Sequence, residues 1–117
     1  MLDALPNSNL TACRKAIEAA GTAIKLVKRV PAPSKSLADQ VIRSAASVPA
    51  NLAEGHGRIG RDRTHHWRIA YAPAKEVDCH LWLLCVSGAV HRGKAITALQ
   101  LFDEVRAMTW RLLHPDS

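Results

Sequence analysis

The chain has 117 residues, 48% of them hydrophobic and 22% charged, which is the composition of one globular domain and excludes a disordered chain. Sixteen Lys and Arg against ten Asp and Glu give a net charge of +6, which favours a polyanionic partner if the charge is clustered. The longest apolar run, 81–86, is too short to cross a membrane, and no signal peptide is recognised. We therefore expect a cytoplasmic protein that does not enter a membrane.

Four segments carry apolar residues at helical spacing, which predicts helices over about 9–30, 35–56, 62–90 and 94–113. In the first segment the apolar residues that would form one face of the helix, here called its seam, recur every three or four positions: Leu10, Cys13, Ile17, Ala20, Ile24 and Val27. The sequence contains no alternating pattern typical of strands. We predict one all-α domain over 1–117, an antiparallel up-down-up-down four-helix bundle.

Two of the predicted helices have a proline in their interior. Pro49 cannot donate to the carbonyl of Ala45, and Pro73 cannot donate to the carbonyl of Ile69. Because the apolar spacing continues through both positions, we expect each proline to kink its helix rather than end it. Gly55, Gly57 and Gly60 are expected to close the second helix, with Gly55 at its end.

The second helix also has a polar stripe at spacings of four, four, three and four: Arg43, Ser47, Asn51, Glu54 and Arg58. One interpretation is a binding surface in which Asn51 and Glu54 contact a ligand or nucleic acid. The other is a polar network that fixes this helix against the third helix or a neighbouring subunit, and we favour it because a kinked helix exposes backbone groups that need partners. Glu54 is expected to pair with Arg58 or with an arginine of the third helix.

Catalytic and metal-binding patterns are weak in this sequence. Glu76 and Asp78 are two residues apart, so on a helix they point away from each other and do not form an acid/base pair. The histidines at 56, 65, 66 and 80 lack a recognisable ligand spacing, and no CxxC pair occurs among the cysteines at 13, 79 and 85. We predict reduced core thiols, no metal, no cofactor and no enzymatic activity.

Basic residues gather at the two ends of the predicted bundle. One end collects six cations against a single acid, Asp39: Lys25, Lys28, Arg29, Lys35, Arg92 and Lys94. The opposite end collects four arginines: Arg58, Arg61, Arg63 and Arg68. Both ends are candidate surfaces for RNA or DNA, and the alternative is a solvated surface without a ligand. Helix dipoles favour cations such as Lys25 near a C-terminus, but not Lys35, Arg92 and Lys94 at helix N-termini.

Residues 44–58, SAASVPANLAEGHGR, resemble the Ser-Ile-Pro-x-Asn-Ile-Ala-Glu-Gly signature of the four helix bundle proteins, also called 23S rRNA intervening sequence proteins. The resemblance extends over roughly 10–113 and includes Ala70 and Glu76, where the family commonly has Ala-x-Gly-Ser-x-x-Glu. Here Ala72 and Pro73 replace the Gly-Ser pair, so no role of that serine carries over.

The resemblance implies a four-helix protomer that assembles into a homopentamer. It implies little about activity, since most members are uncharacterised and none is an established enzyme. A related branch, the accessory proteins of diversity-generating retroelements, is similar in being a basic pentamer that binds nucleic acid and a reverse transcriptase. We therefore expect a non-enzymatic oligomer that binds RNA or DNA through its basic ends, or else a scaffold for a protein partner without nucleic-acid binding. Glu76 is expected to belong to the polar network or to a subunit interface.

Overall fold

The computed structural model describes residues 8–116, with side-chain positions from Thr11 onward. Over this range the chain forms five α helices and one short 3-10 helix, and no strand. The elements are α1 (Ser8–Val27), η2 (Ala32–Ser34), α2 (Lys35–His56), α3 (Gly60–Ile69), α4 (Tyr71–Val86) and α5 (Arg92–Leu113). The described part of the chain is therefore all-helical, as the sequence predicted.

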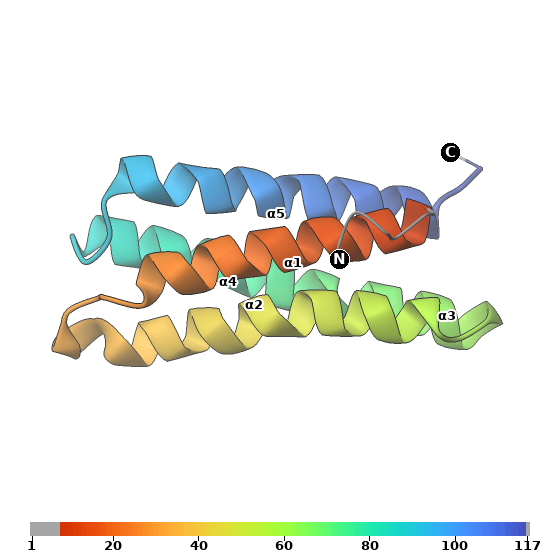
Figure 1. The fold of residues 1–117 in the computed structure, drawn as a ribbon, viewed down its shortest axis with the longest axis horizontal. Coiled ribbons are helices and arrows are strands. Elements are labelled where there is room, and N and C mark those ends of the chain that lie inside the picture. The colour runs from red at the N-terminus through yellow and green to blue at the C-terminus, as the bar shows by residue number, and fades with distance from the viewer. Residues whose placement is uncertain (1–7, 117) are drawn as a thin grey trace.

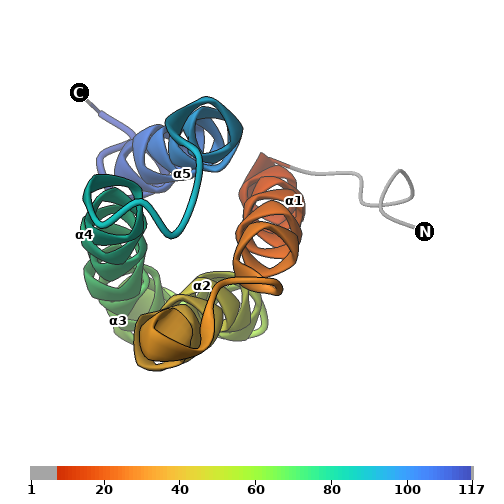
Figure 2. The same ribbon diagram turned by 90° about the vertical axis from the view of Figure 1, so that its left-hand side faces the viewer.

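The helices lie lengthwise in a bundle with principal extents of 44, 26 and 23 Å (Figure 1). Viewed along the bundle, α1 lies between α5 and α2, and the α3–α4 pair completes the other side (Figure 2). Lys15 of α1 is 3.3 Å from Glu104 of α5, and Cys13 Sγ is 3.7 Å from the carbonyl oxygen of Pro49 in α2. The start of α1 thus lies beside the later parts of α2 and α5.

The core is built from small side chains on α1 and larger ones on the facing helices. On α1 the fully buried positions are mostly alanines: Ala12, Ala16, Ala19 and Ala23. Phe102, Leu52, Leu81 and Leu84 from the other helices fill the space opposite them. The predicted seam is therefore wrong at Ile17, which is 41% exposed, because the alanine face allows closer helix packing than an isoleucine would. Leu10, also assigned to the seam, lies outside the described side chains.

The helix α2 runs unbroken through Pro49, and its bounds are those indicated by the sequence. Of the glycines expected to close this helix, Gly57 is the C-cap residue, whereas Gly55 lies inside the last turn because the helix continues to His56. Gly55 is instead the place where Trp67 of α3 packs against α2. A Cβ added to Gly55 would lie 2.5 Å from Cδ1 of the Trp67 indole, so only a glycine permits this approach.

The third predicted helix, 62–90, is divided in the structure. α3 ends at Ile69, α4 begins at Tyr71, and Pro73 lies in the first turn of α4. A proline there leaves no helical hydrogen bond unmade, because the first-turn N–H groups have no partner inside the helix. The single helix of the prediction is therefore replaced by two, with the break at Ala70.

The chain folds back sharply between α4 and α5. Gly88 has a φ of +83°, a conformation that glycine adopts without strain, and the N–H of Val90 donates to the carbonyl of Leu84. This turn ends α4 at Val86, earlier than predicted, and α5 begins at Arg92, two residues before the predicted position of 94. At the other junction α1 ends at Val27 rather than near residue 30.

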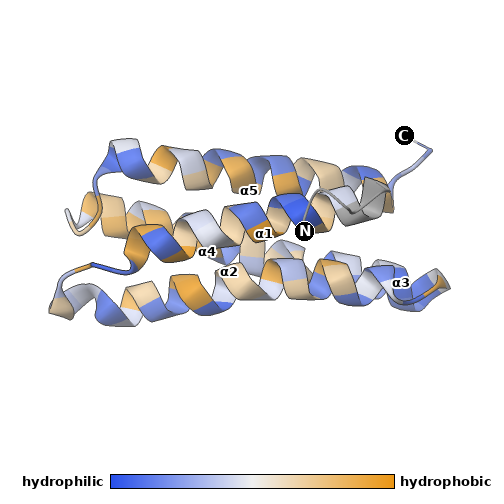
Figure 3. Cartoon of the chain, viewed as in Figure 1, coloured by the Kyte–Doolittle hydropathy of each residue, from blue (hydrophilic) through white to orange (hydrophobic). Residues whose placement is uncertain are grey.

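Hydrophilic and apolar residues are mixed along the long helices α1, α2 and α5, as the colours in Figure 3 show. Consistent with this, none of the helices in residues 8–116 is long and apolar enough to span a membrane.

Candidate nucleic-acid interface

The six cations Lys25, Lys28, Arg29, Lys35, Arg92 and Lys94, here called the lysine end, lie where α1 and α4 finish and α2 and α5 begin. Four of them surround one open groove between α1 and α5, with a volume of about 730 Å³. The groove is lined by Thr22, Lys25, Leu26, Lys28, Arg29 and Lys94. The structure therefore brings together Lys94 and three cations that are about 65 residues away in the sequence.

The four cations of this groove are solvent-exposed. Within residues 8–116 the ion pairs involve other side chains, and no Asp or Glu pairs with any member of the lysine end. Segments 19–38 and 79–102, which supply this end, contain no Asp or Glu. The result is a concave surface with one sign of charge, which concentrates anions near it.

Two members of the lysine end lie outside the groove. Lys35 opens α2 and is exposed. Arg92 opens α5, and its guanidinium carbon lies 5.3 Å from the ring centroid of Trp82 on α4, a cation–π contact. The neighbouring His91 caps α5, because its Nδ1 accepts from the N–H of Gly93 at 3.1 Å. Trp82 is an element of this surface that the sequence analysis missed, since only tertiary packing places it beside Arg92.

The four arginines Arg58, Arg61, Arg63 and Arg68 are here called the arginine end. The first three lie at the α2–α3 junction, and Arg68 lies in the last turn of α3. Arg58 donates to Glu54 from Nε and from an η nitrogen, at 3.0 and 2.7 Å, and pairs with Asp62 at 3.5 Å. These contacts raise the pKa of Arg58, chiefly through its hydrogen bonds to Glu54. Of the two partners predicted for Glu54, the structure selects Arg58.

Arg63 at the arginine end stabilises the fold through hydrogen bonds to backbone carbonyls. Its guanidinium donates to the carbonyl oxygens of Gly55, His56 and Arg58, at 3.2, 3.0 and 2.8 Å, and so caps the C-terminus of α2. It also lies 5.5 Å from the centre of the Trp67 ring. Two of the four arginines are thus engaged in local contacts, while Arg61 and Arg68 are exposed.

The polar stripe of α2 is only partly a network between helices. Ser44 donates to Glu76 of α4 at 2.8 Å, and this bond joins the two helices. Asn51 donates within α2, to the carbonyl and hydroxyl oxygens of Ser47, so it does not reach the carbonyl of Ala45 that Pro49 leaves without a donor. Sequence reasoning omitted Ser44, although its position in the same register as the inward-facing Val41 and Val48 was a usable signal.

A shallow polar groove of about 310 Å³ lies between α2 and α4 beside this bond. Its lining residues are Gln40, Arg43, Ser44, Ser47, Pro73 and Glu76. Three residues of the predicted polar network therefore lie close together: Arg43, Ser47 and Glu76. The other two, Asn51 and Glu54, lie further along α2 and do not line the groove. The groove is open to solvent.

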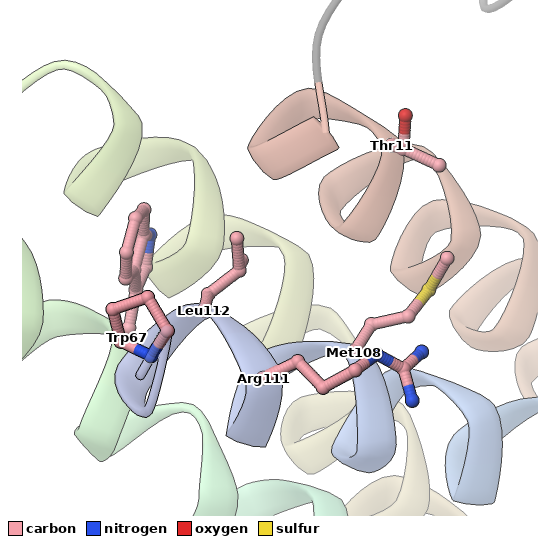
Figure 4. A pocket seen from close by; sticks show the side chains of 6 residues that line it. Thr11, Trp67, Met108, Arg111 and Leu112 are labelled. Atoms are coloured by element: carbon pink, nitrogen blue, oxygen red, sulfur yellow. The ribbon is translucent and has the colours of Figure 1, made fainter. Parts of the chain in front are cut away.

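An apolar pocket of about 440 Å³ lies at the other end of the bundle, lined by Thr11, Trp67, Met108, Arg111, Leu112 and Pro115 (Figure 4). Met108, Arg111 and Leu112 come from one stretch of α5, and Thr11 faces them from α1. Among the described residues of the lining, Arg111 is the charged side chain, and none is an acid, a histidine or a cysteine.

The cysteines differ from one another in environment. Cys13 is buried, and burial raises the pKa of its thiol. Cys79 is exposed, so the prediction of core thiols is wrong for this residue. No group of three or more His, Cys, Asp or Glu suited to a metal ion occurs in the described range 8–116.

These features define a small all-helical bundle protein with an open cationic groove at one end. The chain belongs to the family of 23S rRNA-intervening sequence proteins, because the sequence model of that family matches residues 8–111. A protein of unknown function from the S23 ribosomal protein family of Bacteroides thetaiotaomicron has a similar crystal structure, with a TM-score of 0.83 and 22% sequence identity. The similarity covers 92% of this chain and 99% of that one, and it supports the fold alone. No curated protein matches the sequence.

Proposed function

We propose that this protein is a non-enzymatic module that binds RNA or DNA through the lysine end. The observation that carries the proposal is the open groove in which Lys25, Lys28, Arg29 and Lys94 face solvent without an acidic partner. Phosphates that replace the counterions of such a groove release those ions into solution, which drives binding at low salt. The arginine end supports binding less well, because Arg58 and Arg63 already have partners.

Favourable interactions with the helix dipoles do not explain why all of these cations lie at the groove. Lys25 lies in the last turn of α1, where a cation interacts favourably with the helix dipole by a few tenths of a kcal/mol. Lys94 lies in the first turn of α5, where the same dipole disfavours it. A cation at an electrostatically unfavourable position, next to three others, is the arrangement expected if an external anion supplies the compensating charge.

We also propose that the protomer assembles into a homo-oligomer, a pentamer by its family resemblance. Large apolar side chains exposed on α1, α4 and α5 support assembly: Ile17, Leu83, Val86 and Ile96. A pentamer would repeat the cationic groove fivefold. Light scattering tests this, with about 64 kDa expected, five times the protomer mass of 12.8 kDa, and a monomeric mass would refute it.

Two finer features of the protomer belong to the same proposal. An up-down-up-down order of the long helices is supported by the contacts that pair the start of α1 with late α2 and α5. A bend in α2 is expected at Pro49, which lacks the donor for Ala45, and a change of direction is expected at the α3–α4 break before Pro73.

The experiment that tests nucleic-acid binding measures fluorescence anisotropy of labelled RNA and DNA, single- and double-stranded, at about 50 and 200 mM salt. We expect binding at the lower salt and a fall in affinity of more than tenfold at the higher salt if three or more phosphates are neutralised. The variant R92E/K94E should lose binding while its circular dichroism spectrum stays unchanged. Absence of binding to every probe at the lower salt would refute the proposal.

A scaffold for a protein partner is the second candidate function. The exposed Leu83 and Val86 on α4 favour it, because such side chains lose contact with water when a partner covers them. Affinity purification after nuclease treatment distinguishes the two functions. A stoichiometric protein partner that survives nuclease supports the scaffold.

A further inference from the structure

The contact between Arg92 and Trp82 places an aromatic ring beside a cation at the lysine end. Trp82 projects from the outer side of α4 with 38% of its surface exposed, and the Arg92 guanidinium covers part of its ring. Leu83 and Val86 on α4 and Ile96 on α5 are also exposed. An aromatic and aliphatic surface thus accompanies the cations at the lysine end.

The first turn of α5 connects this surface to the groove. Residues two apart on a helix point in nearly opposite directions, about 200° apart. Arg92 accordingly reaches α4 and Trp82, while Lys94 reaches α1 and lines the groove with Lys25 and Lys28. A ligand that crosses the start of α5 would meet stacking groups first and phosphate-binding groups next.

A single strand exposes base faces that a duplex hides by stacking and pairing. Exposed aromatic rings and guanidinium planes bind such faces, and each stacked base contributes about 1–3 kcal/mol. A duplex would use the groove cations but would gain nothing from Trp82. Both kinds of group are present at the same end of the bundle, which matches a strand with free bases better than a duplex.

We propose that the lysine end binds single-stranded nucleic acid, with a base stacked on the Arg92–Trp82 pair and phosphates held in the groove by Lys25, Lys28 and Lys94. This inference rests on the proposed function and adds to it the class of nucleic acid and the role of Trp82.

The test compares three labelled probes of about 12 nucleotides at about 50 mM salt: a single strand, a duplex and an abasic single strand. RNA and DNA versions of the single strand distinguish the two sugars. The abasic strand keeps the phosphates but has no bases to stack. Trp82→Ala and Trp82→Leu remove the aromatic face, and Leu also keeps an apolar side chain in place. Trp110→Ala is the matched control, because Trp110 is an exposed tryptophan of α5 near the opposite end, with 47% of its surface accessible against 38% for Trp82.

We expect both Trp82 substitutions to weaken single-strand binding about tenfold, corresponding to one stacked base, and to leave duplex and abasic binding unchanged. Trp110→Ala should change none of the three affinities. Two results of the titrations would overturn the inference: equal losses for all probes, or equal effects of the Trp82 and Trp110 substitutions. A changed oligomeric mass in the Trp82 variants would also overturn it, because Trp82 would then be a subunit contact. Binding of all probes without preference for the single strand overturns only this inference, whereas absence of any binding also refutes the proposed function.

Discussion

The lysine end and the arginine end both collect cations, six and four respectively, but they differ in what those cations contact. At the arginine end Arg63 caps α2 and Arg58 pairs with Glu54 and Asp62, so half of the charge is used inside the protomer. At the lysine end four cations face one groove without acidic partners. A count of basic residues therefore does not identify a binding surface, because cations that stabilise the fold have little capacity left for a ligand.

Charge reversal at each end is the strongest test of this difference. The variant K25E/K94E replaces two groove cations with anions, and we expect its affinity for RNA or DNA to fall about a hundredfold at about 50 mM salt. The matched variant R61E/R68E at the arginine end makes the same change of four charge units and should lower affinity less than about threefold. Anisotropy titrations measure both, and equal losses would show that net charge alone controls binding.

The packing at the arginine end is tested by Gly55→Ala. The new Cβ would lie 2.5 Å from Cδ1 of the buried Trp67 and 3.0 Å from the carbonyl oxygen of Arg63. Overpacking of this kind costs about 3 kcal/mol, and the gain of about 1 kcal/mol in helix propensity offsets part of it. We expect the free energy of unfolding to fall by about 2 kcal/mol in urea denaturation.

Gly57→Ala serves as the control for that substitution. A Cβ at Gly57 has its closest contact at 3.7 Å, an ordinary van der Waals distance. Its stability should therefore match the parent protein or exceed it slightly. If the two alanine variants are equally stable, the close approach of Trp67 to Gly55 is not a constraint on the fold.

The capping role of Arg63 is tested by Arg63→Met, which keeps the length of the side chain and removes its hydrogen bonds to three carbonyls. We expect a loss of about 1–1.5 kcal/mol, since each such bond contributes modestly at a partly exposed position. Arg61→Met, at a neighbouring exposed position, should change stability by less than about 0.5 kcal/mol. Thermal unfolding followed by circular dichroism measures both, and nucleic-acid affinity should be unchanged in the Arg63 variant.

A partly buried ion pair, located away from both ends of the bundle, gives the smallest expected effect and a pH signature. Arg106 of α5 lies 2.8 Å from Asp78 of α4, and it also contacts the exposed Asp103. Burial raises the pKa of Asp78 above its ordinary value of 3.8, and Arg106 opposes this shift. A raised carboxyl pKa means that the folded state disfavours the charged form, so this contribution lowers stability as pH rises above the unfolded value.

Arg106→Met removes the opposing cation, so the penalty for a charged Asp78 increases. We expect a loss of about 1 kcal/mol at pH 7.5 and a smaller loss at pH 4.5, where protonation of Asp78 relieves the penalty. Asp103→Asn, which removes the exposed partner of Arg106, should have a small effect at both pH values. Thermal unfolding at the two pH values measures the difference, and a loss independent of pH would show that Asp78 stays uncharged or solvated in the variant.

Local pattern was a good guide wherever the interaction was also local. The helical spacing indicated all-α structure, and the bounds of α2 agree with those predicted from its apolar residues. The pair Glu54–Arg58 is four residues apart on one helix, so sequence spacing was enough to propose it. The absence of acids from the segments that supply the lysine end is likewise a property of the sequence.

Features that depend on contacts between helices could not be read from the chain. Ile17 fits the apolar period of α1, but the alanines of that helix face the core, because close packing selects the small side chains. Gly55 looked like a helix end, and its role is to admit Trp67 from the next helix. Ser44, rather than Asn51, bonds across to α4, because direction as well as spacing decides which side chain reaches a neighbour.

By itself the sequence determined the all-α character, the bounds of α2, the family signature and the position of the charge along the chain. Tertiary structure decided which cations remain available, because only packing brings Lys94 to the end of α1 and Arg92 to Trp82. The physical reason is the range of the interactions: helix periodicity acts over three or four residues, whereas the groove joins segments separated by most of the chain.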